Sequence, residues 1–155
     1  MTNHLPKETE FTIRTANQTL PLVKMIVQDV VALSREVAET RERLEYLAEG
    51  RDDAGLEDLY STELSSIEQN TELKSNKVDQ FIQELTVLHL GATAVTDGFV
   101  DFPATRENEA VFLCWHLGDK EVMYWHHRDE GCAARRLVDL PLIRQSGDRH
   151  YSNLA

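Results

Sequence analysis

The sequence predicts an α+β protein in which a long antiparallel helical hairpin at the N-terminus packs with a small antiparallel sheet at the C-terminus. Two long stretches repeat apolar side chains in alternating steps of four and three residues, which is the period of a helix. After Gly91 this period gives way to short β-favouring segments separated by turn signals. The length of 155 residues fits a single domain. Within it we expect the hairpin over 11–90, the sheet with the site candidates over 92–137, and an irregular tail over 138–155.

The first helix is expected from about Ala16 to Ala48. Thr15, followed by Gln18 three residues later, has the form of a capping box at its start. Pro21 lies inside this stretch and removes one backbone hydrogen bond. We therefore expect either a kink at Pro21 or a helix that begins at Thr19.

The second helix is expected from Tyr60 to Leu88, with its end at Leu90-Gly91. Residues 50–55 form a short polar connection, and so short a connection makes the two helices run antiparallel. The outer half of the hairpin is rich in charge and has no sheet to cover it. We expect a second copy of the chain or another protein to cover it, and we prefer a homodimer through the helices; the alternative is that this half stands in solvent.

Strands are expected over 93–96, 99–102, 110–116 and 122–127. Asp97-Gly98 is a hairpin signal, and Gly118-Asp119-Lys120 marks the next turn. If that turn closes around 118–121, side chains that alternate along each strand fall into two sets. One face would carry Leu113, Trp115, Tyr124 and His126, and the other Cys114, His116, Trp125 and His127. A slip of one residue would regroup them.

The charge balance argues against two classes of partner. Sixteen basic and 27 acidic residues leave a formal net charge of -11, which repels phosphate backbones and anionic lipids. We therefore expect no nucleic acid and no membrane as partner. The first ten residues contain no apolar core and no run of about 18 apolar residues occurs, so a cytoplasmic protein is expected. In such a compartment Cys114 and Cys132 are expected as free thiols rather than as a disulfide.

Several blocks, taken in order, resemble one known family. They are Phe11-Thr12, Ala16-Asn17, Leu20-Pro21, Gly98-Phe99-Val100-Asp101-Phe102-Pro103, Leu113-Cys114-Trp115 with Leu117-Gly118, and Trp125-His126 followed by Gly131 and Arg135. Across nearly the whole chain this resembles the prokaryotic family known as domain of unknown function twenty-two-oh-three. The resemblance implies no activity. It implies a small soluble prokaryotic protein with recurrent polar positions at Asp101, His126 and Arg135, and it marks His116 and His127 as departures.

The preferred site sets Asp101 beside His126, with Asp129 or Glu130 from the loop that follows as a further metal ligand. A carboxylate that fixes one ring nitrogen of histidine leaves the other free to bind a metal or to move a proton. The sequence does not identify a cofactor, and a divalent metal such as zinc is the candidate that this site would suit. Arg135 offers a fixed fork of donors to an anionic group of a small-molecule ligand. The ligand-binding candidates are Trp115, Tyr124 and Arg135.

Two other interpretations of the same residues stay open. Asp101 and Arg135 could form an ion pair that locks the sheet to its C-terminal loop, with His126 bonded to a backbone carbonyl. Alternatively, Cys114 could bind zinc together with His116 and His127, although no fourth ligand is evident and a lone cysteine is more often a small packing residue.

The function expected from these observations is a binding or assembly module that dimerises through its helices and has a small pocket near His126. The alternative is a small metal-assisted hydrolase with His126 and Asp101 as the catalytic candidates, in which water is the nucleophile and Arg135 holds an anionic substrate. The hydrolase lacks a complete set of mutually positioned groups in the sequence.

Overall fold

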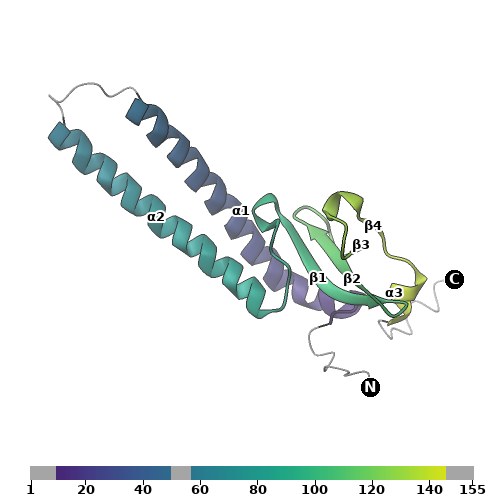
Figure 1. Cartoon of the computed structure of the whole chain (residues 1–155). Helices are drawn as coiled ribbons and strands as arrows, with labels where there is room; N and C mark the ends of the chain where they lie inside the picture. Colours follow the sequence, from purple (N-terminus) through teal and green to yellow (C-terminus); the bar gives the residue numbers. More distant parts are fainter. Residues whose placement is uncertain (1–9, 50–56, 146–155) are drawn as a thin grey trace, which may run out of the picture.

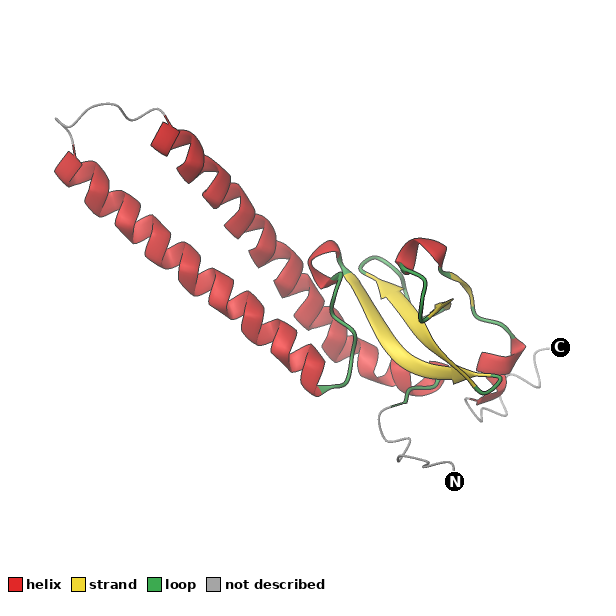
Figure 2. Ribbon diagram, in the orientation of Figure 1, coloured by secondary structure: helices red, strands yellow, loops and turns green. Residues whose placement is uncertain are grey.

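The computed structural model describes residues 10–49 and 57–145 (Figure 1). Its elements are α1 (Ile13–Glu49), α2 (Glu57–Val87), the 3-10 helix η2 (Val95–Asp97), β1 (Phe99–Arg106), β2 (Glu109–His116), β3 (Tyr124–His127), the 3-10 helix η3 (Cys132–Ala134), β4 (Arg136–Leu137) and α3 (Leu140–Gln145). The two long helices lie side by side and reach far beyond the sheet (Figure 2). The predicted α+β class, with a helical hairpin and a small antiparallel sheet, is confirmed.

Helix α1 begins three residues before its expected start. The Thr15 backbone N–H donates to the Thr12 hydroxyl at 3.1 Å, and the Thr12 N–H donates to the Thr15 hydroxyl at 2.8 Å. This reciprocal pair satisfies two backbone donors at the helix start, so the cap is Thr12 and the predicted Thr15–Gln18 box is wrong. Pro21 lies within the helix on its exposed side, and Thr19 is an interior residue.

The hairpin is held by an apolar seam between α1 and α2. Val27 and Val30 of α1 are fully buried, as is Leu85 of α2, while Val78 keeps 8% of its surface exposed. On the flank, Lys74 pairs with Glu36 at 3.3 Å. Exposed ion pairs add little stability, so burial of the aliphatic seam is the main stabilising contribution.

A polar atom is buried in this seam without a partner. The Ser34 hydroxyl oxygen is inaccessible to solvent and makes no hydrogen bond with any of the described residues. Because burial removes its water without a replacement, Ser34→Ala is expected to raise the free energy of unfolding by about 1 kcal/mol, with the better helix propensity of alanine acting in the same direction. Urea denaturation followed by circular dichroism measures this. A less stable Ser34→Ala protein would mean that the hydroxyl is bonded after all.

The four strands form one antiparallel sheet in the order β1-β2-β3-β4. Strand β1 is longer than predicted because it lies at the sheet edge, where Pro103 is tolerated. Its turn to β2 is at Glu107 and Asn108, whose φ values of 48° and 64° are typical of a type I′ turn. The predicted strand over 93–96 is wrong, since Val95–Asp97 forms η2.

The pairing of β2 with β3 differs by one residue from the expected one. Cys114 lies opposite Tyr124 and Leu113 opposite Trp125, so the predicted division of side chains between the two faces is wrong. The connection between these strands is longer than a tight turn because it docks on α1. Asn17 bonds both backbone groups of Val122, at 2.7 and 3.3 Å, and thereby sets where β3 begins.

One face of the sheet forms the core with α1. The buried residues of this face are Val100, Phe102, Ala104, Val111, Leu113, Trp115 and Trp125. Helix α3, which lies in the segment expected to be irregular, adds Leu142 to the same core. Among the described residues, no helix has both the length and the apolar character needed to cross a bilayer.

An ion pair ties the end of β1 to the residue before α3. The Arg106 guanidinium donates to Asp139 from Nε at 3.1 Å and from Nη2 at 2.6 Å. These hydrogen bonds lower the pKa of the Asp139 carboxyl. A carboxyl with a lowered pKa stabilises the fold above its unfolded value of about 3.9, and this contribution is lost as the pH falls through the folded value.

We therefore expect Asp139→Asn to be less stable than the native chain at pH 7 and to approach it as the pH falls below about 4. Urea denaturation midpoints across this range for both proteins provide the measurement. A stability difference that stays constant with pH would contradict a role for the Asp139 charge.

Candidate metal centre

The first two residues of the site face each other across neighbouring strands. Asp101 of β1 is the register partner of Cys114 in β2, and both side chains lie on the sheet face that points away from α1. His126 of β3 shares this face, since it is paired with Phe112, two residues from Cys114. The His126 Nε2 atom lies 3.0 Å from Oδ1 of Asp101. The predicted meeting of one imidazole with one carboxylate is thus present in the structure.

A second thiol completes the group. Cys132 lies on the one-turn helix η3, and its Sγ atom is 3.8 Å from Asp101 Oδ1 and 4.0 Å from His126 Nε2. One ligand atom from each of Asp101, Cys114, His126 and Cys132 lies within 4.8 Å of every other. We call these four residues the Asp101 cluster. Three strands and the segment after β3 therefore converge on one point.

The backbone fixes the tautomer of His126. Its Nδ1 atom lies 2.8 Å from the carbonyl oxygen of His127, which can only accept, so Nδ1 carries a proton. The second nitrogen, Nε2, then faces Asp101 and Cys132 with its lone pair whenever the ring is neutral. A histidine that donates through one nitrogen to a carbonyl and offers the other to an ion is the usual arrangement of a metal ligand.

The same geometry does not suit a nucleophilic triad. In such a triad one histidine nitrogen accepts from the nucleophile and the other donates to a carboxylate. Here Asp101 and Cys132 both approach the same nitrogen of His126, and Nδ1 is occupied by a carbonyl.

The cluster is shielded from solvent. Cys114 is fully buried and His126 keeps 1% of its surface exposed, whereas Asp101 and Cys132 are partly exposed. Burial raises the pKa of the Cys114 thiol and of the Cys132 thiol, and the negative charge of Asp101 acts in the same direction. Deprotonating both sulfurs beside a carboxylate therefore calls for a compensating positive charge.

Arg135 holds the Cys132 segment against the sheet. It follows η3 directly, and its guanidinium lies 4.1 Å from the centre of the Tyr124 ring. Its Nη1 atom donates to Asp119 at 2.6 Å, and the same Asp119 oxygen accepts from the backbone N–H of His116. Asp119 also loses water on burial, yet these hydrogen bonds leave its pKa below the ordinary value. The alternative interpretation, in which Arg135 pairs with Asp101, is wrong, because Arg135 pairs with Asp119.

The structure separates the other sequence candidates from the cluster. Asp129 is exposed and contributes no atom to it. Trp115 is fully buried on the opposite face, where its indole N–H donates to the Asp119 carbonyl at 3.0 Å, so it lines no pocket beside His126. His127 also lies on that face and pairs with Glu109, while His116 contacts Phe99, so neither joins Cys114 in a metal site.

Cys132 is the residue that reasoning from the sequence missed. It stands in a loop, six residues after His126, with no second cysteine nearby in the chain to form a motif. The number of cysteines was a possible clue to the site, because the chain has two cysteines and both belong to the cluster.

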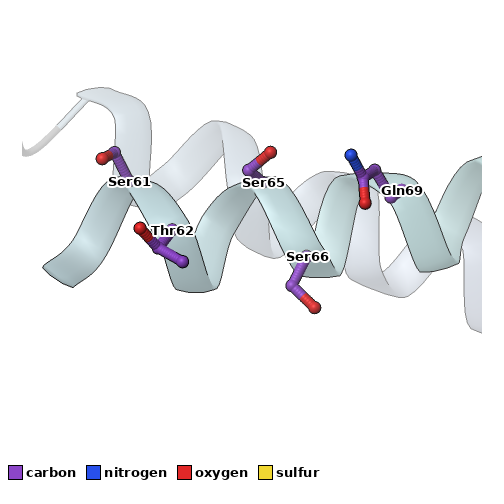
Figure 3. A pocket seen from close by; sticks show the side chains of 5 residues that line it. All are labelled: Ser61, Thr62, Ser65, Ser66 and Gln69. Atoms are coloured by element: carbon purple, nitrogen blue, oxygen red, sulfur yellow. The ribbon is translucent and has the colours of Figure 1, made fainter. Parts of the chain in front are cut away.

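A separate hollow of about 650 Å³ lies on the exposed side of α2 (Figure 3). Its lining residues are Ser61, Thr62, Ser65, Ser66 and Gln69. The hollow is wide open, and neither an aromatic nor a charged side chain lines it. Binding sites for small molecules are usually enclosed and combine such side chains in their walls. The Asp101 cluster is therefore the stronger candidate for function.

A family model described as "Uncharacterized conserved protein (DUF2203)" matches residues 10–138, which include the whole Asp101 cluster. No curated protein and no solved structure matches the chain.

Proposed function

Because this chain belongs to the family described as uncharacterized conserved protein (DUF2203), a description that names no activity, we propose its function from the site: the protein binds one zinc ion through Asp101, Cys114, His126 and Cys132. The observation that carries the proposal is the convergence of four ligand atoms from four segments within 4.8 Å. Two thiolates with one imidazole and one carboxylate form a donor set that favours zinc over magnesium or calcium.

The spacing of the donors supports a tetrahedral ion. Zinc bonds of about 2.0 to 2.3 Å correspond to tetrahedron edges of roughly 3.3 to 3.8 Å. The contacts of Asp101 with His126, at 3.0 Å, and with Cys132, at 3.8 Å, bracket this range. Small shifts of the side chains would bring all four donors to bonding distance.

The proposed site is closed and therefore structural. Four protein ligands fill a tetrahedral zinc ion, whereas catalytic zinc sites keep one position for water or substrate. The burial of Cys114 and His126 leaves little room for an organic ligand beside the ion. In this role zinc joins β1, β2 and β3 to the η3 segment. The hydrolase alternative lacks support because a closed site leaves no position for water or substrate on the ion. In addition, Arg135, which would hold the substrate, is paired with Asp119.

The test is a zinc titration of the untagged, metal-free chain by calorimetry, with metal content measured after dialysis. We expect one zinc per chain for the native protein. Cys132→Ala should weaken binding at least tenfold, as expected for the loss of a ligand or its close support. Asp129→Ala is the matched control, because Asp129 is a nearby exposed acid outside the cluster, and it should bind like the native chain. Equal affinity of both variants would refute the assignment.

We also propose that the helical hairpin is a surface for a second copy of this chain. The outer part of the hairpin has no sheet beside it (Figure 1). Large apolar side chains of both helices are exposed to solvent: Tyr46 of α1 is 76% exposed and Leu73 of α2 is 68% exposed. Light scattering at micromolar concentration should give a dimer mass, and Leu73→Glu should shift it to the monomer. Val30 is unsuitable for this test because it is fully buried within one chain. A native chain that is monomeric at these concentrations would refute the proposal.

A further inference from the structure

The two cysteines of the chain lie close to each other, and this proximity allows a reaction that zinc binding does not require. They are the chain's full complement of thiols, and their sulfur atoms lie within 4.8 Å of each other. A disulfide requires about 2.05 Å, so the sulfurs must approach by less than about 3 Å. We propose that Cys114 and Cys132 form a redox pair, which a hydroperoxide oxidises to an intrachain disulfide with release of the bound metal; the metal-release part rests on the proposed zinc site.

The two cysteine sulfurs differ in solvent exposure and in the element that carries them, and these differences assign each sulfur a role in the oxidation. Cys114 lies in β2, a central strand, and is fully buried. Cys132 lies in a one-turn helix and is partly exposed. A hydroperoxide therefore reaches Cys132 first, and Cys114 stands behind it as the resolving sulfur. The short η3 segment is also the one able to move, because it has few residues to carry with it.

The reaction balances as a two-electron oxidation. The Cys132 thiolate attacks one peroxide oxygen, the O–O bond breaks, and with one proton a water molecule leaves, which gives a sulfenic acid. The Cys114 thiolate then attacks the Cys132 sulfur, the S–O bond breaks, and the departing hydroxide takes up a second proton as water. Two thiolates, one hydrogen peroxide and two protons thus become one disulfide and two waters.

Oxidation removes two of the four metal donors. Asp101 and His126 remain, and one carboxylate with one imidazole is too small a set to hold zinc in competition with water. The positive Arg135 side chain stays close through its bond to Asp119 and its stacking on Tyr124. It keeps η3 near the sheet in both states, so reduction can restore the site.

The experiment treats zinc-loaded full-length protein with hydrogen peroxide while a chromophoric chelator reports free zinc. Free thiols are counted in parallel. The masses of alkylated, unreduced samples are measured by mass spectrometry. We expect one zinc to be released for every two thiols lost, a monomeric product with an intrachain disulfide, and recovery of both thiols and zinc binding on reduction. In Cys132→Ser, the remaining buried thiol of Cys114 should react at least tenfold more slowly than the thiols of the native chain.

Other outcomes separate this inference from the zinc proposal. If zinc binds but peroxide leaves both thiols free, or links two chains, the redox pair is refuted and the zinc site stands. Metal-free protein is oxidised as a further arm. If zinc never binds but this arm forms the intrachain disulfide, the thiol pair stands and the zinc site, with its release step, is refuted. Rapid oxidation of Cys114 in Cys132→Ser would overturn the assigned order.

Discussion

Trp115→Ala is expected to lower the free energy of unfolding by about 3 to 5 kcal/mol, the typical cost of removing a fully buried tryptophan. The indole is the largest side chain with no exposed surface, and it lies where β2 packs on α1. Its N–H donates to the Asp119 carbonyl, so the substitution also leaves a partly buried acceptor without this partner. For a chain of this size the melting temperature should fall by roughly 10 °C.

Urea denaturation at neutral pH measures the effect, and Leu137→Ala is its control. Leu137 is 65% exposed, so its replacement should change stability by less than about 0.5 kcal/mol. A loss below about 1 kcal/mol for Trp115→Ala would mean that the indole does not occupy the core. Because Asp119 also holds Arg135, the variant should in addition loosen the segment that carries Cys132.

Zinc is expected to raise the free energy of unfolding of the native chain by about 2.7 kcal/mol when free zinc stands roughly a hundredfold above its dissociation constant. In His126→Ala this protection should vanish at the same zinc concentration. The imidazole supplies the nitrogen ligand atom of the cluster, and alanine offers no atom to replace it. Thermal melts with and without zinc give the difference directly.

His127→Ala provides a closely matched control for His126→Ala. The two residues are adjacent in β3, but their side chains lie on opposite faces of the sheet, and His127 pairs with Glu109 outside the cluster. Zinc should protect His127→Ala as it protects the native chain. Loss of protection in both variants, or in neither, would contradict the assignment of His126 as a ligand.

The parts of the fold that follow from local pattern were predictable from the sequence. The alternation of apolar residues through Val27, Val30 and Val78 indicates two paired helices, because the repeat holds over many turns. The start of α1 was misplaced because two threonine pairings compete there, and Thr12 with Thr15 forms the actual cap. Pattern gives an element's type more securely than its boundary.

The register of β2 and β3 could not be predicted from the turn alone. A tight turn around 118–121 would have placed Trp115 on the face of His126. The actual register depends on the contact of Asn17 with Val122, which are 105 residues apart in the chain. Pairings at such separation leave no local signature in the sequence.

The site was predictable only in part, for the same physical reason. Asp101 and His126 stand near aromatic residues on expected strands, and the sequence therefore favoured them. Cys132 enters the cluster through the path of a loop, which is fixed by the pairing of Arg135 with Asp119. Asp129, three residues earlier, is also a possible metal ligand by its chemistry, yet it is exposed and contributes no atom to the cluster, since loop geometry decides which side chain turns inward.

Gly91 connects the long hairpin to the cluster. It follows α2, and both of its backbone groups bond to those of Asp101, at 2.8 and 3.0 Å. A β-carbon at Gly91 would lie 3.1 Å from the β-carbon of Asp101, so a larger residue there would press on the Asp101 side chain. Helix α2 has 31 residues and is about 46 Å long. The helical hairpin is thus bonded at its inner end to the strand that carries Asp101, so a partner that displaced the outer turns of α1 and α2 would also move the backbone of this proposed metal ligand.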